Sequence, residues 1–125
     1  MKSIFRYNKN HESELIELLK AEPDWSSFTN ADALDKFKNA LLCSQTYIYK
    51  SQDNICGYLR ALVDGFGIYV SELYIAPRYR NQGYARELLK RIKQEHQSLD
   101  VYLLSDEDLY YEKLGYKRVG SVFEL

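Results

Sequence analysis

Several residue types that would mark a special class of protein are scarce in this chain of 125 residues. Its two cysteines, Cys43 and Cys56, have the spacing of neither a metal site nor a redox pair, so neither a metal nor a disulfide framework is expected. No apolar run approaches the roughly 20 residues of a membrane helix, and the polar first ten residues are unlike a signal peptide. We therefore expect one reduced, cytoplasmic domain covering 1–125.

A large charge of one sign is also absent. The chain carries 17 basic and 18 acidic side chains, a net charge of −1, which argues against a general binder of nucleic acid or of anionic membranes. What it has in excess is tyrosine, with 12 residues beside five phenylalanines and one tryptophan. Tyrosine serves both in cores and in pockets that need a phenol hydroxyl, so the count leaves both uses open.

The spacing of apolar residues predicts a mixed α/β domain. The expected strands are short apolar or alternating runs, at 4–7, 46–50, 55–63, 66–76, 99–104 and from Tyr116 onward. The expected helices have apolar residues three or four apart, at 11–21, 30–42, 85–96 and 105–114. Strands 66–76 and 99–104 are joined by a helix, so they should pair in parallel through a right-handed crossover. We expect one mostly antiparallel sheet with a parallel strand pair and helices on both faces.

A strand, a tight loop and a helix start follow one another over residues 73–85. Pro77 ends the strand because proline cannot donate to a ladder. Gly83 lies where the first backbone N–H groups of the helix are unpaired, and without a Cβ it lets a ligand approach closely. A helix N-terminus favours an anion such as a pyrophosphate, and Arg80 adds a charged donor. An ordinary strand–helix turn would have the same residues, so both interpretations stay open.

Two motifs in this region resemble a known family. Arg80-x-x-Gly83-x-Ala85 resembles the acetyl-CoA signature of the GNAT superfamily of N-acetyltransferases. Residues 110–116, YYEKLGY, are similar to the family's second motif, and residues 57–65 resemble its third strand and hairpin. The motifs stand in the expected order, and the resemblance is specific from about residue 55 to residue 119.

The resemblance implies the GNAT acyl-CoA N-acyltransferase fold, in which the parallel strands splay and the pantetheine arm of the cosubstrate lies in the gap. It implies transfer of acetyl from acetyl-CoA to an amine of a small molecule or peptide, by direct attack in a ternary complex. The residues implied to bind acetyl-CoA lie on the strand and the loop: Leu73, Tyr74, Ile75, Arg80, Asn81, Gln82, Gly83, Tyr84 and Ala85. Tyr111 matches the tyrosine that often protonates the departing thiolate.

The attacking amine needs a base, because at a pKa of about 10.4 it is mostly protonated at neutral pH. Strand alternation points Glu72 to the same side as Tyr74, which makes Glu72 the favoured base. Tyr69 is a second candidate, since some family members carry their base at that strand position. A chain of water molecules could replace both.

Other titratable residues are expected to have structural roles. His11 and His96 lie at the ends of expected helices and should be solvated. Arg60 is expected to pair with Asp64 or Glu72, with an acidic group of the substrate as the alternative. The ten residues after Gly115 hardly fit the two closing strands of the family, so one strand should leave an edge free or pair with a second subunit, as in a homodimer.

Two further functions remain open at this stage. A catalytically silent module could use the same loop to sense an acyl-CoA. A toxin-like acetyltransferase could act on aminoacyl-tRNA, although the net charge of −1 counts against a nucleic-acid partner.

Overall fold

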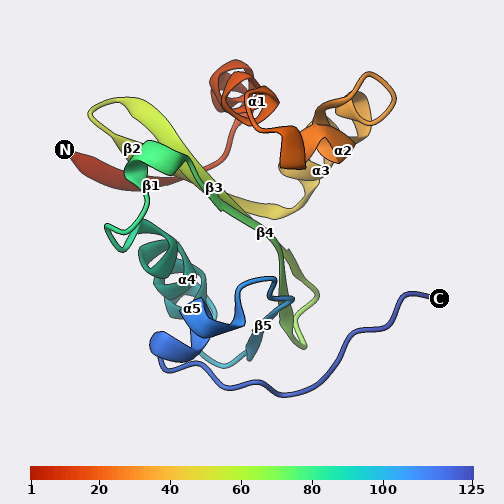
Figure 1. Cartoon of the computed structure of the whole chain (residues 1–125), viewed down its shortest axis with the longest axis vertical. Helices are drawn as coiled ribbons and strands as arrows, with labels where there is room; N and C mark the ends of the chain where they lie inside the picture. Colours follow the sequence, from red (N-terminus) through yellow and green to blue (C-terminus); the bar gives the residue numbers. More distant parts are fainter.

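A five-stranded sheet forms the centre of the computed structural model, which describes residues 1–125. The strands lie in the order of the sequence, β1 to β5: β1 Lys2–Arg6, β2 Gln45–Ser51, β3 Asn54–Val63, β4 Ile68–Ile75 and β5 Val101–Leu103. The first four are antiparallel neighbours, and β4 pairs with β5 in parallel. The expected mixed sheet is confirmed, and its strong twist is visible in Figure 1.

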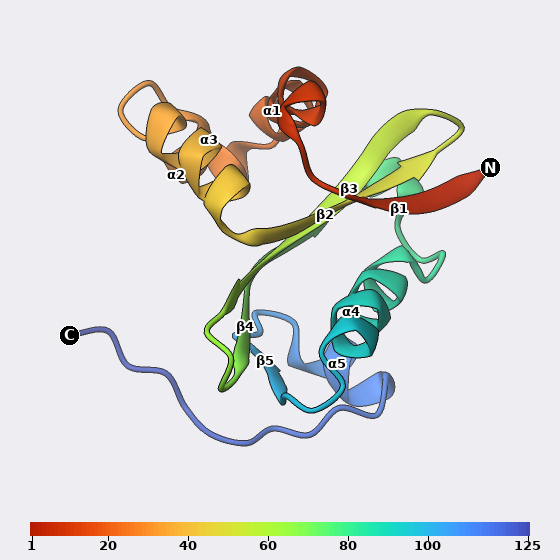
Figure 2. The same ribbon diagram turned by 180° about the vertical axis from the view of Figure 1, so that it is seen from behind.

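Helices cover both faces of this sheet, as Figures 1 and 2 show. The helices are α1 Glu12–Lys20, α2 Ser26–Thr29, α3 Leu34–Cys43, α4 Tyr84–Glu95 and α5 Asp108–Lys113, with short 3-10 turns at Lys9–His11, Pro23–Trp25 and Pro77–Tyr79. Strand alternation divides the core: Tyr47 and Tyr49 of β2 pack with α4, whereas Ile48 between them packs with α1 and α3. None of the helices is both long and apolar enough to span a membrane.

The buried tyrosines combine an apolar ring with a polar tip at the edge of the core. Tyr47 and Tyr49 are fully buried, and their hydroxyls donate to Glu95 and Glu87 on α4, at 2.7 and 2.5 Å. These bonds satisfy the hydroxyls without placing a charge in the core. Much of the tyrosine excess is therefore structural.

A β-bulge in β4 lies at the point where its pairing with β5 ends. Arg60 of β3 faces Glu72, but the next residue, Ala61, faces Val70, so Ser71 is the extra residue on β4. Pairing with β5 covers only Ile68 to Val70 and ends where the bulge begins. Beyond the bulge, β4 continues to Ile75 with a neighbouring strand on its β3 side alone.

The prediction of a strand from Tyr116 onward is wrong. No helix or strand follows α5, and residues 117–125 form no backbone hydrogen bond. Only the start of this segment is held, by the backbone bond from Tyr116 to Tyr111 and by the ion pair of Arg118 with Asp108. Two of its apolar side chains, Val119 and Phe123, are 66% and 84% exposed. With no strand beside it to complete a ladder, an alternating pattern alone does not make a strand.

Several expected boundaries also move. The helix expected at 30–42 starts at Leu34, because the Asn30 side chain accepts from the Ala33 amide and forms a turn first. Asn8 caps the 3-10 turn Lys9–His11 that leads into α1, where its side chain and that of His11 form a capping box. The last helix starts at Asp108, since Ser105 forms a local turn with the Glu107 amide.

Candidate functional site

The outer edge of β4 beyond the bulge is the first part of the candidate site. Residues 71–75 have no strand partner on the β5 side. The Leu73 side chain packs against the α4 side of the core. Its backbone lies on the edge that β5 does not pair. At the end of this edge the Ile75 carbonyl accepts from Arg80 Nε at 2.7 Å. The site therefore presents a short length of strand with unpaired backbone groups.

The loop after β4 turns the chain so that the start of α4 faces the same edge. Asn81 and Gly83 both have positive φ, 64° and 84°, a conformation that favours glycine and that asparagine tolerates. Gly83 is the N-cap of α4, and no side chain caps it. A Cβ on Gly83 would meet nothing within 4 Å. The space over the cap is open.

This helix start carries unpaired donors. The Glu87 amide bonds back to Gly83, but the amides of Tyr84, Ala85 and Arg86 form no backbone hydrogen bond. Three free N–H groups at the positive end of a helix make a binding place for an anion. The loop and helix expected to hold a diphosphate therefore offer unpaired N–H donors to an anion.

Two of the residues expected to bind acetyl-CoA, Tyr84 and Tyr74, direct their side chains away from the start of α4. Tyr84 is buried, stacks on Tyr49 at 4.2 Å between ring centres, and donates to Gln82 Oε1, so only its backbone is available. Tyr74 lies on the opposite face of the sheet, where its hydroxyl donates to Glu22 at 2.8 Å and its ring meets Trp25.

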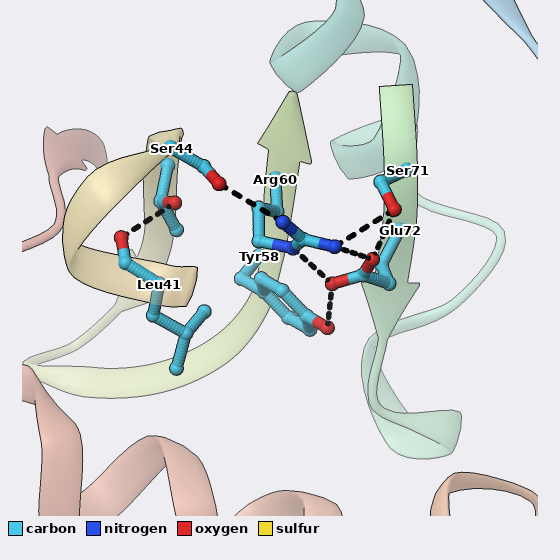
Figure 3. A network of polar contacts seen from close by, with 7 residues as sticks. Leu41, Ser44, Tyr58, Arg60, Ser71 and Glu72 are labelled. Carbon is cyan, nitrogen blue, oxygen red and sulfur yellow. Dashed lines mark hydrogen bonds and ion pairs between the residues drawn. The ribbon is translucent and has the colours of Figure 1, made fainter. Parts of the chain in front are cut away.

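Glu72, the favoured base, lies in a buried polar network (Figure 3). Its carboxylate accepts four hydrogen bonds: from Tyr58, from Arg60 Nε and Nη2, and from Ser71. Arg60 in addition donates to Ser44 Oγ at 2.9 Å. The side chains of Arg60 and Glu72 are only 14% and 3% exposed. The hydrogen bond to Glu72 raises the pKa of Arg60, so the guanidinium keeps its charge.

Tyr111, the expected acid, lies on α5 and packs against the core on the α4 side of the sheet. Its ring meets Tyr110 edge-on at 5.1 Å and lies parallel to that of Tyr116 at 6.5 Å. Burial, followed by the charges nearby, raises its pKa to about 12. The Tyr111 hydroxyl has no hydrogen-bond partner within the chain. The Tyr7 hydroxyl is the one fully buried side-chain oxygen without a partner, so the Tyr111 hydroxyl is not fully buried and is open to solvent. It is a protonated donor at neutral pH.

The other residues considered as bases lie elsewhere. Tyr69 is 38% exposed and lines a shallow hollow of about 520 Å³ with Phe66 and Tyr102, near the β3–β4 hairpin. His11 is buried, which corrects the expectation that it is solvated. Its Nδ1 accepts the Asn8 amide, and burial lowers its pKa. His96 is half-buried and bonds Gln45 at 2.7 Å.

The expected pairing of Arg60 with Glu72 is confirmed, but the sequence pattern did not single out the other partners in this network. Ser71 and Tyr58 look like ordinary strand residues, and Ser44 follows a helix. Only the shift in register between β3 and β4 brings Ser71 under Arg60, and no spacing rule predicts a bulge. No group of three or more metal-ligating side chains is present in the structure.

Comparisons with known proteins bear on the fold and on the family. An aminoglycoside acetyltransferase from an uncultured soil metagenomic sample has a similar structure, with a TM-score of 0.76 and 19% identity over 100% of this chain and 97% of that one. A GNAT family acetyltransferase of Streptococcus pneumoniae has a TM-score of 0.72 and 20% identity over 100% of this chain and 98% of that one. The aminoglycoside N-acetyltransferase AAC(6')-Iy in complex with CoA has a TM-score of 0.78 and 17% identity over 100% of this chain and 93% of that one. At these identities the likeness shows the fold. No curated protein matches. The model of the acetyltransferase (GNAT) domain matches residues 43–118, more than half of the sequence. This chain belongs to the GNAT acetyltransferase family.

Proposed function

We propose that this protein transfers the acetyl group of acetyl-CoA to an amine of a small molecule or peptide, by direct attack of the amine in a ternary complex. The observation that carries the proposal is the meeting of the open β4 edge, residues 71–75, with the uncapped start of α4 at Gly83. An extended arm with amide groups can pair with such an edge as an added strand would. Its diphosphate then reaches the free amides of the helix.

The donor set fits acetyl-CoA better than a nucleoside triphosphate. No lysine follows Gly83, and the glycine-rich loop that wraps a triphosphate is absent. Leu73 and Ile75 supply apolar surface beside backbone groups along the edge. The neighbouring structure of AAC(6')-Iy holds CoA in the same fold, which supports the assignment.

In the proposed reaction the amine nitrogen forms a bond to the thioester carbonyl carbon, and the carbon–sulfur bond breaks. The leaving thiolate, whose parent thiol has a pKa near about 8.5, takes a proton from the Tyr111 hydroxyl. The nitrogen loses two protons: one leaves the ammonium before the attack, and the second, lost after the new bond forms, restores Tyr111 through solvent. The products are the acetylated amine, free CoA and one released proton.

We propose that water, rather than Glu72, removes the proton from the amine. An ionised carboxylate has about four acceptor positions, and four donors already occupy those of Glu72. It has no free lone pair to accept the proton of a substrate while Arg60 stays in place. Glu72 then acts by holding the strand.

The test of the function is the release of CoA thiol from acetyl-CoA in the presence of polyamines, amino acids, aminoglycosides and peptide amines. Thiol release that depends on one amine class supports the proposal and names the acceptor. Binding of acetyl-CoA without release to any amine would instead favour a sensing module. Activity with aminoacyl-tRNA alone would favour the toxin-like function.

The proposed binding of the diphosphate at the start of α4 is tested by Gly83→Asp. Saturating acetyl-CoA, at about 100 times its Kd, should stabilise the wild type by about 2.7 kcal/mol and raise its Tm by about 10 °C. Because a carboxylate at this position repels phosphate oxygens, the variant should lose this shift. Gly83→Asn is the matched control, since it has the same size and the same tolerance of positive φ without the charge. A shift in Gly83→Asp as large as that of the wild type would place the diphosphate elsewhere.

The role of Glu72 is tested by the pH dependence of Glu72→Gln. If Glu72 only holds the strand, kcat/KM should fall by a similar factor, about tenfold, from about pH 7 to about pH 10. If it accepts the proton, the loss should shrink as pH approaches the pKa of the amine, where no base is needed. A loss confined to neutral pH would therefore return Glu72 to the role of base.

A further inference from the structure

Arg60 reaches across from β3 and touches both residues of the β4 bulge. Its Nη2 donates to Ser71 Oγ at 2.9 Å and to Glu72 Oε2 at 2.6 Å, and its Nε donates to Glu72 Oε1 at 2.7 Å. Figure 3 shows the guanidinium lying between β3 and β4, with these bonds fanning out from it. The planar fork of an arginine can hold both oxygens of one carboxylate while it also reaches a neighbouring hydroxyl, and a lysine ammonium lacks this bidentate geometry.

The place of these contacts coincides with the parting of β4 from β5. The register shift puts Ser71 out of step with β3, and the last β4–β5 pair, Val70 with Leu103, comes one residue earlier. In a regular ladder the strand would go on pairing after Val70. Arg60 thus binds the two side chains at the point where the open edge begins.

The burial of this pair also calls for an explanation. A buried ion pair seldom stabilises a protein more than apolar residues of similar size would, and here the two side chains are 14% and 3% exposed. Its contacts, however, have a direction that apolar contacts lack, since each bond fixes one oxygen. The pair is therefore better suited to fixing a backbone shape than to adding stability.

We propose that Arg60 is a positioning residue that holds the β4 bulge in its bent form and so keeps the edge at residues 71–75 open for the arm of acetyl-CoA. This inference rests on the proposed function, because the edge matters only if a ligand pairs with it. Arg60 does not touch the ligand. Without it, β4 can straighten and continue its pairing toward the chain after Leu103.

The test removes the ion pair without leaving a charge buried. Arg60→Met alone strands the Glu72 carboxylate and is expected to destabilise the protein, so the variant to use is Arg60→Met with Glu72→Met. The double variant should fold with a Tm close to that of the wild type. Its Kd for acetyl-CoA should rise about tenfold or more, since the arm loses one or two backbone hydrogen bonds. Equilibrium binding avoids any dependence on which group serves as base.

One control variant and a second readout separate positioning from general packing. Ser44→Ala removes the fourth contact of Arg60 but leaves the contacts to Ser71 and Glu72 intact, so its affinity for acetyl-CoA should equal that of the wild type. Amide hydrogen exchange without ligand gives a second readout. In the double variant the amides of residues 71–75 should exchange more slowly, because closing the gap gives them strand partners.

The outcomes are distinct. If the wild type does not bind acetyl-CoA, the proposed function fails. If the wild type binds and the folded double variant binds equally well, or its exchange at residues 71–75 is unchanged, Arg60 does not hold the bulge and the proposal is overturned.

Discussion

Tyr111→Phe is expected to lower kcat by about 10²–10⁴-fold, the usual loss when a general acid is removed. The substitution deletes one hydroxyl that has no partner within the chain, so the packing of the ring against Tyr110 and Tyr116 should persist. The Tm and the Kd for acetyl-CoA should stay close to those of the wild type. Steady-state rates of thiol release, with binding measured separately, test this expectation.

The raised pKa of Tyr111 sets the pH dependence of the effect. Because burial raises this pKa to about 12, the hydroxyl keeps its proton through the whole neutral and mildly alkaline range. Removing it should lower the height of the pH–rate profile without moving its acid limb. Tyr110→Phe is the matched control, as a neighbouring phenol with no assigned role. Equal turnover in the two variants would make Tyr111 a packing residue.

Gly57→Val is expected to cost about 3 kcal/mol or more of the free energy of unfolding, the largest structural effect that we predict. A Cβ at Gly57 would lie 2.3 Å from the Tyr74 carbonyl oxygen and 2.5 Å from Ile75 Cδ1. The first contact is with backbone, which a rotamer change cannot relieve. Either β3 and β4 separate or the strand next to the open edge shifts, so binding of acetyl-CoA should also suffer.

Thermal unfolding followed by circular dichroism gives the stability of the variant. Gly67→Val provides the comparison, since a Cβ at Gly67 meets nothing within 4 Å and its backbone φ is not positive. If Gly57→Val melts within a few degrees of Gly67→Val, then β3 and β4 do not approach as closely as the structure has them.

The sequence predicted the elements whose signals are local. Pro77 ends β4 within two residues of the expected place, and the apolar spacing of Leu88, Leu89 and Ile92 marked the buried face of α4. The parallel pairing of β4 with β5 followed from the helix between them. In contrast, the expected strand after Gly115 failed because strand formation depends on a partner, which an alternating pattern does not guarantee.

In the candidate site, too, one part could be predicted from the sequence and another could not. The loop with Arg80 and Gly83 could be located from residue types, because a glycine at positive φ and a helix start have recognisable signatures. The network around Glu72 could not, since it depends on a bulge that shifts Ser71 by one position. Alternation pointed Glu72 toward the correct face, and its pairing with Arg60 was among those expected, but no pattern indicated that Tyr58 and Ser71 also occupy its oxygens.

The half-paired length of β4 also affects how the protein behaves in concentrated solution. A strand with free backbone groups on one side is a template for any other extended chain, and proteins normally protect such edges with charges, prolines or a covering loop. Residues 71–75 contain neither proline nor lysine, and the proposed ligand would cover them. Saturation with acetyl-CoA should therefore slow aggregation on storage beyond its effect on unfolding, and the cellular supply of the ligand would influence how much of the protein stays soluble.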